Sequence, residues 1–161
     1  MRLHAGTARA APPPPPEWVE WEKCIFDHVA GMQGEVVVAH CVSEDAAISA
    51  GIAPRICRRL CDRQAAIRDI ARASTRVAIT QGSDDNVRVA HLRTKKAKTD
   101  LPSLASVREA LNEFFSLLAT GSGRPTVVIP RIASKLDGLL WDDVRVQVIG
   151  RRATRPLAGS R

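Results

Sequence analysis

The sequence predicts an α/β protein, in which helices cover a sheet of buried strands, because strand-like and helix-like segments alternate along the chain. Residues 36–39 and 126–130 are short continuous apolar runs, which are typical of strands buried on both faces. Residues 102–119 carry apolar side chains at steps of three and four, which predicts an amphipathic helix with one face on a core. The 161 residues contain no internal repeat and suffice for one domain with a sizeable core.

The N-terminal half contributes two further elements to this pattern. Residues 17–26 alternate loosely between apolar and polar side chains, which predicts a first strand. A helix is predicted from about Ile52, because Pro54 is tolerated in a first helical turn and apolar residues then recur near helical spacing. The apolar positions that support this helix are Ile56, Leu60, Ile67 and Ile70.

Two strands and an ambiguous C-terminal segment complete the prediction. Residues 76–80 and 87–92 are strand-like runs joined by a hairpin-type connection at 81–86, and 94–98 form a basic loop. After Trp141 the pattern fits a short helix or a strand equally well. The alternation that favours the strand comes from Val144, Val146 and Val148.

The net charge of +7 is concentrated at the two ends of the chain. Residues 1–16 contain two arginines and no acid, and residues 150–161 contain four arginines and no acid, so the ends supply six of the seven charges. We predict a disordered Pro-rich tail at 1–16, a folded domain at 17–149 and a basic tail at 150–161. The tails could assist contact with phosphates, but the charge says little about the folded domain.

Composition also indicates a compartment. No apolar stretch approaches the roughly 20 residues that cross a bilayer, and residues 1–16 lack the apolar segment of a secretory signal. We therefore interpret the protein as intracellular, in cytoplasm or nucleus, with no membrane partner.

The four cysteines fit a reducing compartment. Cys57 and Cys61 are four residues apart, so on a helix they would share a face like half of a metal site. No histidine or carboxylate pair at ligand spacing completes such a site in the sequence. We expect buried free cysteines, with no disulfide and no metal.

Two loops follow the strands that are predicted to be buried, at the ends where open α/β sheets bind ligands. The first loop, 43–52, is rich in small residues and leads directly into a helix. Small residues allow backbone N–H groups to approach an anion closely. On this observation alone, tight packing is favoured over phosphate binding.

Three sequence segments shift the balance from tight packing toward ligand binding. The first is His-Cys-Val-Ser-Glu-Asp at 40–45, followed by Ser-Ala-Gly-Ile-Ala at 49–53. The second is Thr-Lys-Lys at 94–96, followed by Pro102 and a helix, and the third is Pro-Arg-Ile at 130–132, followed by Leu-Asp-Gly-Leu-Leu-Trp at 136–141. In order and spacing they resemble the ligand motifs of macro domains that act as terminal ADP-ribose protein glycohydrolases, and together they cover about residues 36–143.

This resemblance implies a macro-domain-like three-layer α/β/α sandwich with a central mixed sheet. It also implies an ADP-ribosyl hydrolase that binds ADP-ribose and removes mono-ADP-ribose from acidic side chains of modified proteins. In that subfamily the first Lys of Thr-Lys-Lys is the nucleophile and the Asp after Leu is its partner, which match Lys95 and Asp137. A neutral amine can displace an ester carboxylate or capture the opened sugar, and a carboxylate can carry the proton.

The same resemblance implies the ligand-binding set, no cofactor and no metal, and a protein that we expect to act as a monomer. The ligand-binding residues so implied are His40, Ser43, Glu44, Asp45, Ser49, Ala50, Gly51, Ile52, Ile132, Ala133, Ser134, Lys135 and Leu136.

Other interpretations of these residues stay open. The run 93–98 fits a solvated basic loop, and Asp137 fits an ordinary turn residue before glycine. A Cys–His hydrolase built on His40 and Cys41 is disfavoured, because neighbours on a strand point to opposite faces. His91 could serve as the base for Cys41, although nothing in the spacing requires it.

Three departures from the family pattern stand out. Cys24 lies near the position of the Asp that accepts from the adenine amino group, with Asp27 as the nearest substitute. Residues 133–135 read Ala-Ser-Lys where the subfamily has two glycines, one residue apart. The chain also ends soon after Trp141, where the family has a helix and a last strand, so 144–149 could fill one place in a smaller sheet.

These departures keep further functions in view. An alternative substrate is mono-ADP-ribose on nucleic acid bases, on which similar Lys-dependent macro domains of antitoxins act. A second class is a non-catalytic ADP-ribose reader, and a third is an interaction protein that uses its polyproline tail.

Overall fold

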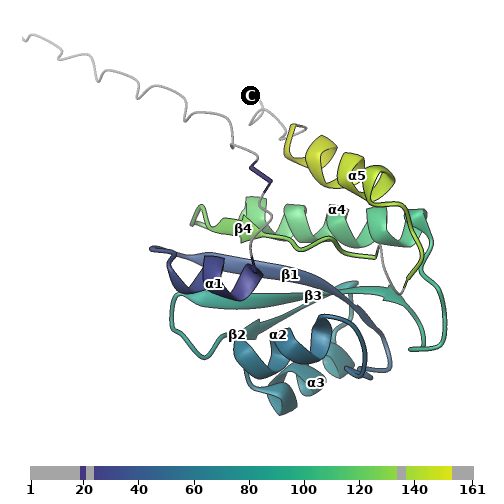
Figure 1. Cartoon of the computed structure of the whole chain (residues 1–161), viewed down its shortest axis with the longest axis horizontal. Coiled ribbons are helices and arrows are strands. Elements are labelled where there is room, and N and C mark those ends of the chain that lie inside the picture. The colour runs from purple at the N-terminus through teal and green to yellow at the C-terminus, as the bar shows by residue number, and fades with distance from the viewer. Residues whose placement is uncertain (1–18, 21–23, 134–136, 154–161) are drawn as a thin grey trace, which may run out of the picture.

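The protein is described here by a computed structural model, which covers residues 19–20, 24–133 and 137–153. Within these residues, a four-stranded mixed sheet lies between two layers of helices (Figure 1). This arrangement confirms the predicted three-layer α/β/α sandwich. The strands are β1 (Val36–Ser43), β2 (Val77–Gln81), β3 (Val87–Lys95) and β4 (Thr126–Val128).

The sheet has the strand order β2-β3-β1-β4. Strand β1 pairs in parallel with β3 and with β4, and β2 pairs antiparallel to β3. Because β1 and β3 run in the same direction, their carboxyl ends lie at the same edge, where Ser43 pairs with Lys95 after a shift of register. Strand β3 therefore continues through Thr94 and Lys95, two residues that the sequence had suggested for a loop.

One face of the sheet is covered by α1 (Ile25–Ala30), α2 (Ala53–Arg59) and α3 (Arg63–Arg72). The prediction of one helix from Ile52 onward is wrong, because the helical conformation is interrupted between the end of α2 and the start of α3. Asp62 is the N-cap of α3, and its carboxylate accepts a hydrogen bond of 2.7 Å from the N–H of Ala65. The break lets Ile56 and Ile70 both reach the core, where each is fully buried.

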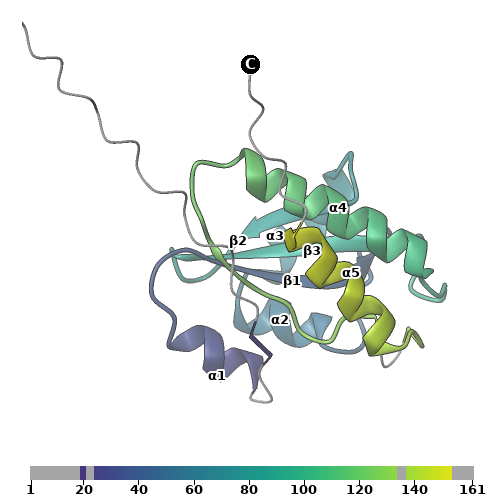
Figure 2. The same cartoon turned by 90° about the horizontal axis from the view of Figure 1, so that it is seen from above.

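The other face is covered by α4 (Leu104–Thr120) and α5 (Trp141–Ala153), as seen from above in Figure 2. Helix α4 begins with a capping box in which the side chains of Ser103 and Ser106 each accept a backbone N–H of the other. The ambiguous segment after Trp141 is a helix, with Val144 and Val148 fully buried four residues apart. The idea that 144–149 fill a place in the sheet is therefore wrong.

The strand expected at 17–26 is also wrong where the structure describes it. Ile25 and Phe26 lie in α1, where Phe26 and Val29 are buried three residues apart on the same core. Residues 17, 18 and 21–23 lie outside the described part, as does the tail predicted at 1–16. Helix α5 continues to Ala153, past the predicted end of the folded domain at 149. Among the described residues, we find no helix of the length and apolarity that crossing a membrane requires.

Candidate functional site

A cleft of about 1100 Å³ opens at the carboxyl edge of β1 and β3. Its walls come from the end of β1 with the loop that follows, from the end of β3 with residues 98–101, and from the loop after β4. Cleft volumes of roughly 300–1,000 Å³ are usual for sites that enclose small ligands. The cleft is therefore large enough for a ligand of dinucleotide size.

Lys95 and Asp137 meet inside this cleft, although they lie 42 residues apart in the sequence. The Nζ of Lys95 donates to Oδ1 of Asp137 over 2.7 Å. Their side chains are 17% and 16% exposed, so the pair is shielded but open to a bound molecule. An amine and a carboxylate in direct contact at a cleft can exchange a proton between themselves.

The first loop is fastened to the end of β3 by Asp45. Its carboxylate accepts hydrogen bonds from the hydroxyl of Ser43, over 2.5 Å, and from the N–H of Lys98, over 3.0 Å. These hydrogen bonds hold the pKa of the Asp45 carboxyl below its usual value. Asp45 thus fixes the first loop against the segment that carries Lys95.

Positive φ angles shape both loops. Gly51 has a φ of 69°, which glycine adopts at little cost, and it lines the cleft. In the second loop, which follows β4, Ala133 has a φ of 56°, and its carbonyl accepts from the N–H of Leu139 over 3.0 Å. Ala133 begins the stretch in which the subfamily has glycines, so alanine here takes a conformation that glycine would accept without strain.

The structure brings most of the sequence-predicted residues to the cleft. Glu44 is exposed and pairs with Arg93 over 3.9 Å, while His40 is fully buried, and neither of these nor Asp45 lines the cleft. Residues 134–136, predicted as Ser134, Lys135 and Leu136, lie outside the described residues. The predicted residues that line the cleft are Ser43, Ser49, Ala50, Gly51, Ile52, Lys95, Ile132, Ala133 and Asp137.

Cys41 also lines the cleft, beside the lysine–aspartate pair. Burial, and then the charge of Asp137, raise the pKa of the Cys41 thiol to about 12. A thiol with this pKa stays protonated near neutral pH and is a poor nucleophile. A Cys–His hydrolase is also disfavoured by geometry, because Cys41 packs on the core beneath α4 and α5, whereas His40 lies between Val38 and Val42 of the opposite core.

His40 and His91 are paired across β1 and β3 and belong to a polar chain that runs from half-buried Asp69 into the core. The hydroxyl of Thr80 donates to Asp69 over 2.7 Å and so accepts from Nε2–H of His91, 3.0 Å away. Nδ1 of His91 then accepts from Nε2–H of His40 over 2.7 Å. We call these four residues, Asp69, Thr80, His91 and His40, the histidine chain.

The histidine chain lies in the core, not in the cleft. Burial lowers the pKa of His91 to about 4, and burial followed by the charge of His91 lowers that of His40 well below its usual value. Both rings are therefore neutral near neutral pH. Neither His40 nor His91 lines the cleft, so neither is placed to act as a base for Cys41 there.

Several residues of the cleft were missed by the sequence analysis. Arg55 follows the first motif, Lys98, Asp100 and Leu101 follow the second, and Arg131 lies within the third. Their position within or beside the motifs was the available signal, because a loop that carries one cleft residue usually brings its neighbours. The lining holds four cationic side chains, Arg55, Lys95, Lys98 and Arg131, and two acidic ones, Asp100 and Asp137.

Comparison with known proteins identifies the fold. No protein-family model and no curated protein sequence matches the chain. Among solved structures, the macrodomain of Thermus aquaticus DarG is similar with a TM-score of 0.66 and 18% identity, covering 79% of this chain and 87% of that one. The macrodomain of Mycobacterium tuberculosis DarG is similar with a TM-score of 0.61 and 17% identity, covering 74% and 90%.

A third similar structure was solved with a ligand. It is Thermosipho africanus DarTG in complex with ADP-ribose, with a TM-score of 0.62 and 13% identity, covering 73% of this chain and 35% of that one. At these identities the comparisons establish the fold. The chain therefore has the macrodomain fold, as its sequence predicted.

Proposed function

We propose that the protein is an ADP-ribosyl hydrolase that removes mono-ADP-ribose from acidic side chains of modified proteins. The observation that carries the proposal is the contact of 2.7 Å between Nζ of Lys95 and Oδ1 of Asp137 inside the cleft. The pair joins a potential nucleophile to a proton acceptor at hydrogen-bond distance, which is the arrangement that nucleophilic catalysis by an amine requires.

Binding of ADP-ribose is supported by the charge and shape of the cleft. Four cationic side chains line it against two acidic ones, which favours a diphosphate over a neutral ligand. The positive φ at Gly51 lets the backbone of the first loop approach an anion closely. The exposed side chain of Leu101 offers an apolar surface for a base or a ribose at the rim.

The reaction can be written with its protons in balance. Lys95 passes a proton to Asp137, and its neutral amine attacks the anomeric carbon of the distal ribose. The new C–N bond forms as the C–O bond to the ester breaks, and the target carboxylate leaves with the electron pair. Asp137 gives its proton to the departing carboxylate and, once ionised again, accepts a proton from water, whose oxygen displaces the amine and releases ADP-ribose. Asp137 then returns that proton to the amine of Lys95, which restores the starting pair.

The test follows release of labelled ADP-ribose from a protein automodified on Glu, with wild type, Lys95→Ala and Lys96→Ala. Lys96 is the matched control, because it is the neighbouring lysine of the same run and its side chain is exposed outside the cleft lining. We expect Lys95→Ala to lower the release rate by more than about 10³-fold, as removal of a nucleophile does, and Lys96→Ala to leave it nearly unchanged.

Binding of free ADP-ribose, measured by calorimetry on the same variants, separates the rival functions. Binding without release in wild type would replace the hydrolase with a reader module. Absence of binding would leave only an interaction protein. An oligonucleotide with a mono-ADP-ribosylated base, run in parallel, distinguishes a nucleic acid substrate from a protein substrate.

A further inference from the structure

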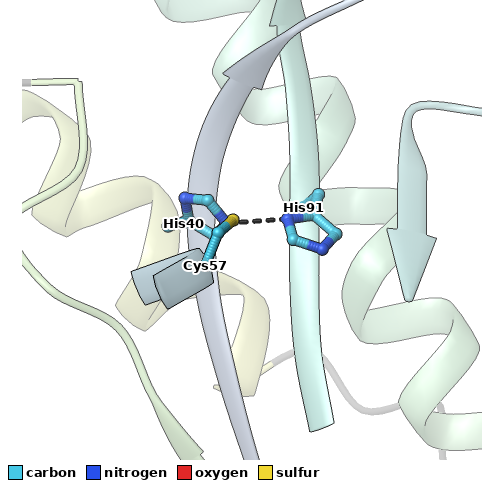
Figure 3. A group of neighbouring side chains, drawn as sticks. All are labelled: His40, Cys57 and His91. Carbon is cyan, nitrogen blue, oxygen red and sulfur yellow. Dashed lines mark hydrogen bonds between the residues drawn. The ribbon is translucent and has the colours of Figure 1, made fainter. Parts of the chain in front are cut away.

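A group of metal-ligating side chains lies in the core, away from the cleft. His40 projects from β1, His91 from β3 and Cys57 from α2, and the three meet between the strands and the helix (Figure 3). One ligand atom of each lies within 4.8 Å of the other two, and all three residues are buried. Two imidazoles and a thiol at this spacing are the donor types that zinc selects.

The hydrogen bonds of the histidine chain leave the ring of His91 prepared for a metal. Its Nε2–H is directed to Thr80, which is held in turn by Asp69, so its Nδ1 is unprotonated, and its lone pair accepts from His40 near Cys57. Metal-ligating histidines characteristically donate their other N–H to such an outer partner, which fixes the tautomer and the ring orientation. His91 therefore has the outer contacts of a ligand.

A fourth donor is available beside Cys57. Cys61 is buried, and its thiol donates to the backbone carbonyl of Cys57 over 3.8 Å. Cys61 lies outside the three residues whose ligand atoms are within 4.8 Å of one another, so its thiol would turn from that carbonyl to bind a metal. Two thiolates neutralise the charge of Zn²⁺, whereas a single thiolate would leave a net positive charge in the core, which is costly. The charge balance therefore favours a site with two cysteines and two histidines.

We propose that His40, Cys57, Cys61 and His91 form a structural zinc site. Two ring nitrogens bound to one tetrahedral zinc, each at about 2.0–2.1 Å, lie roughly 3.3 Å apart. The nitrogens of His40 and His91 are 2.7 Å apart in their hydrogen bond, so the rings separate by about half an ångström as zinc enters. The proton on Nε2 of His40 moves to Nδ1, and each thiol releases its proton to solvent as its thiolate binds.

The site would fasten the first cleft loop to the sheet. Cys57 lies in the last turn of α2 and Cys61 two residues past its end, and α2 directly follows residues 49–52 of that loop. His40 precedes Cys41, which lines the cleft. This inference is independent of the proposed hydrolase, because it concerns bound metal and not ADP-ribose.

The test measures the zinc content of full-length protein from zinc-supplemented cells by mass spectrometry, for wild type, Cys57→Ser and Cys24→Ser. Cys24 is the matched control, because it is a free exposed cysteine outside the group. We expect about one zinc per chain in wild type and Cys24→Ser, and less than about a tenth of that in Cys57→Ser. Chelation should lower the melting temperature of wild type by at least several degrees.

A second measurement on wild type keeps the test decisive if Cys57→Ser fails to fold. Metal-free protein titrated with Co²⁺ should develop the absorption of a cobalt–thiolate bond and lose it on addition of Zn²⁺. Wild type that contains no zinc and shows no such absorption would overturn the proposal. Zinc that persists at wild-type content in folded Cys57→Ser would overturn it as well, because the metal would then lie elsewhere.

Discussion

Two polar groups on the same pair of strands have opposite surroundings. Lys95 ends β3 and meets Asp137 in the cleft, with side chains that are 17% and 16% exposed. The histidine chain lies deeper along β1 and β3, where His40 and His91 are 0% exposed and directly paired in the register. Lys95 lies four positions after His91 on β3, about 13 Å along the extended chain, yet Lys95 is open to a ligand and His91 is buried in the core.

The difference shows that the role of a polar residue depends on whether it lies at the carboxyl edge of the parallel strands or in their buried middle. At the carboxyl edge the loops leave a cleft, so an amine and a carboxylate can contact a substrate. In the interior, helices α2 and α3 cover the strands, so a polar side chain can find hydrogen-bond partners only within the protein. Changes to the cleft pair should therefore alter turnover, and changes to the histidine chain should alter stability.

The largest effect is expected for Asp137→Asn. The amide keeps the size of the side chain but cannot accept the proton of Lys95, so we expect release of ADP-ribose to slow by about 10²–10⁴-fold. The free energy of unfolding should change little, because the ion pair is partly exposed. Single-turnover assays measure the release rate, and urea unfolding of the same protein measures the free energy of unfolding. If the variant lost stability along with its rate, the contrast between the cleft pair and the histidine chain would not hold.

Thr80→Val should have the next largest effect, on stability instead of turnover. Valine removes the hydroxyl that donates to Asp69 and accepts from His91, and leaves a buried ring nitrogen without a partner. We expect the free energy of unfolding to fall by about 1–3 kcal/mol. Thr126→Val is the matched control, because Thr126 lies exposed in β4, and urea unfolding should show little change for it.

Ala133→Gly is expected to have a smaller effect with the opposite sign. Glycine relieves a left-handed conformation that costs alanine about 1–2 kcal/mol, against about 0.4–1 kcal/mol of added entropy in the unfolded chain. The free energy of unfolding should therefore rise by up to about 1 kcal/mol. Ala47→Gly, at a loop position without a positive φ, should lower it instead. Equal shifts in thermal unfolding for both variants would contradict this explanation.

Cys41→Ser should have the smallest effect, although Cys41 lines the cleft. Its raised pKa, about 12, keeps the thiol protonated, so we expect the release rate to change by less than about twofold. The same protonation predicts that iodoacetamide modifies exposed Cys24 long before Cys41 at neutral pH. Mass spectrometry of peptides after timed alkylation measures this order. Rapid labelling of Cys41 would show that its surroundings stabilise a thiolate.

Local patterns predicted much of the fold because they record which side chains must be buried. The run at 36–39 became part of β1, and the apolar stripe at 102–119 became α4 (Leu104–Thr120). The prediction failed at α1, because six residues with two buried side chains give too short a pattern to separate a helix from a strand. It also missed the break before Asp62, because apolar spacing alone does not reveal where a helix is capped.

The candidate site was predictable to a different extent. Lys95 and Asp137 were named through motifs, which carry residue types and spacing but not distances. The grouping of His40 and His91 with Cys57 was missed, because the residues lie on separate elements and share no spacing pattern. The left-handed conformation of Ala133 was missed too, because alanine gives no signal of positive φ.

The sequence by itself determined the longer strands and helices, such as β1, β3 and α4, since burial at a given period depends on neighbouring residues alone. Its motifs also indicated the residues that are candidates for the chemistry. The tertiary structure decided which of them meet, because strand order and parallel pairing bring together residues that are distant in the chain. Parallel pairing of β1 with β3 places Ser43 beside Lys95 at the cleft and His40 beside His91 in the core. No local pattern predicts that register. Parallel strands are joined by a long crossover connection, so their register depends on the packing of the whole domain.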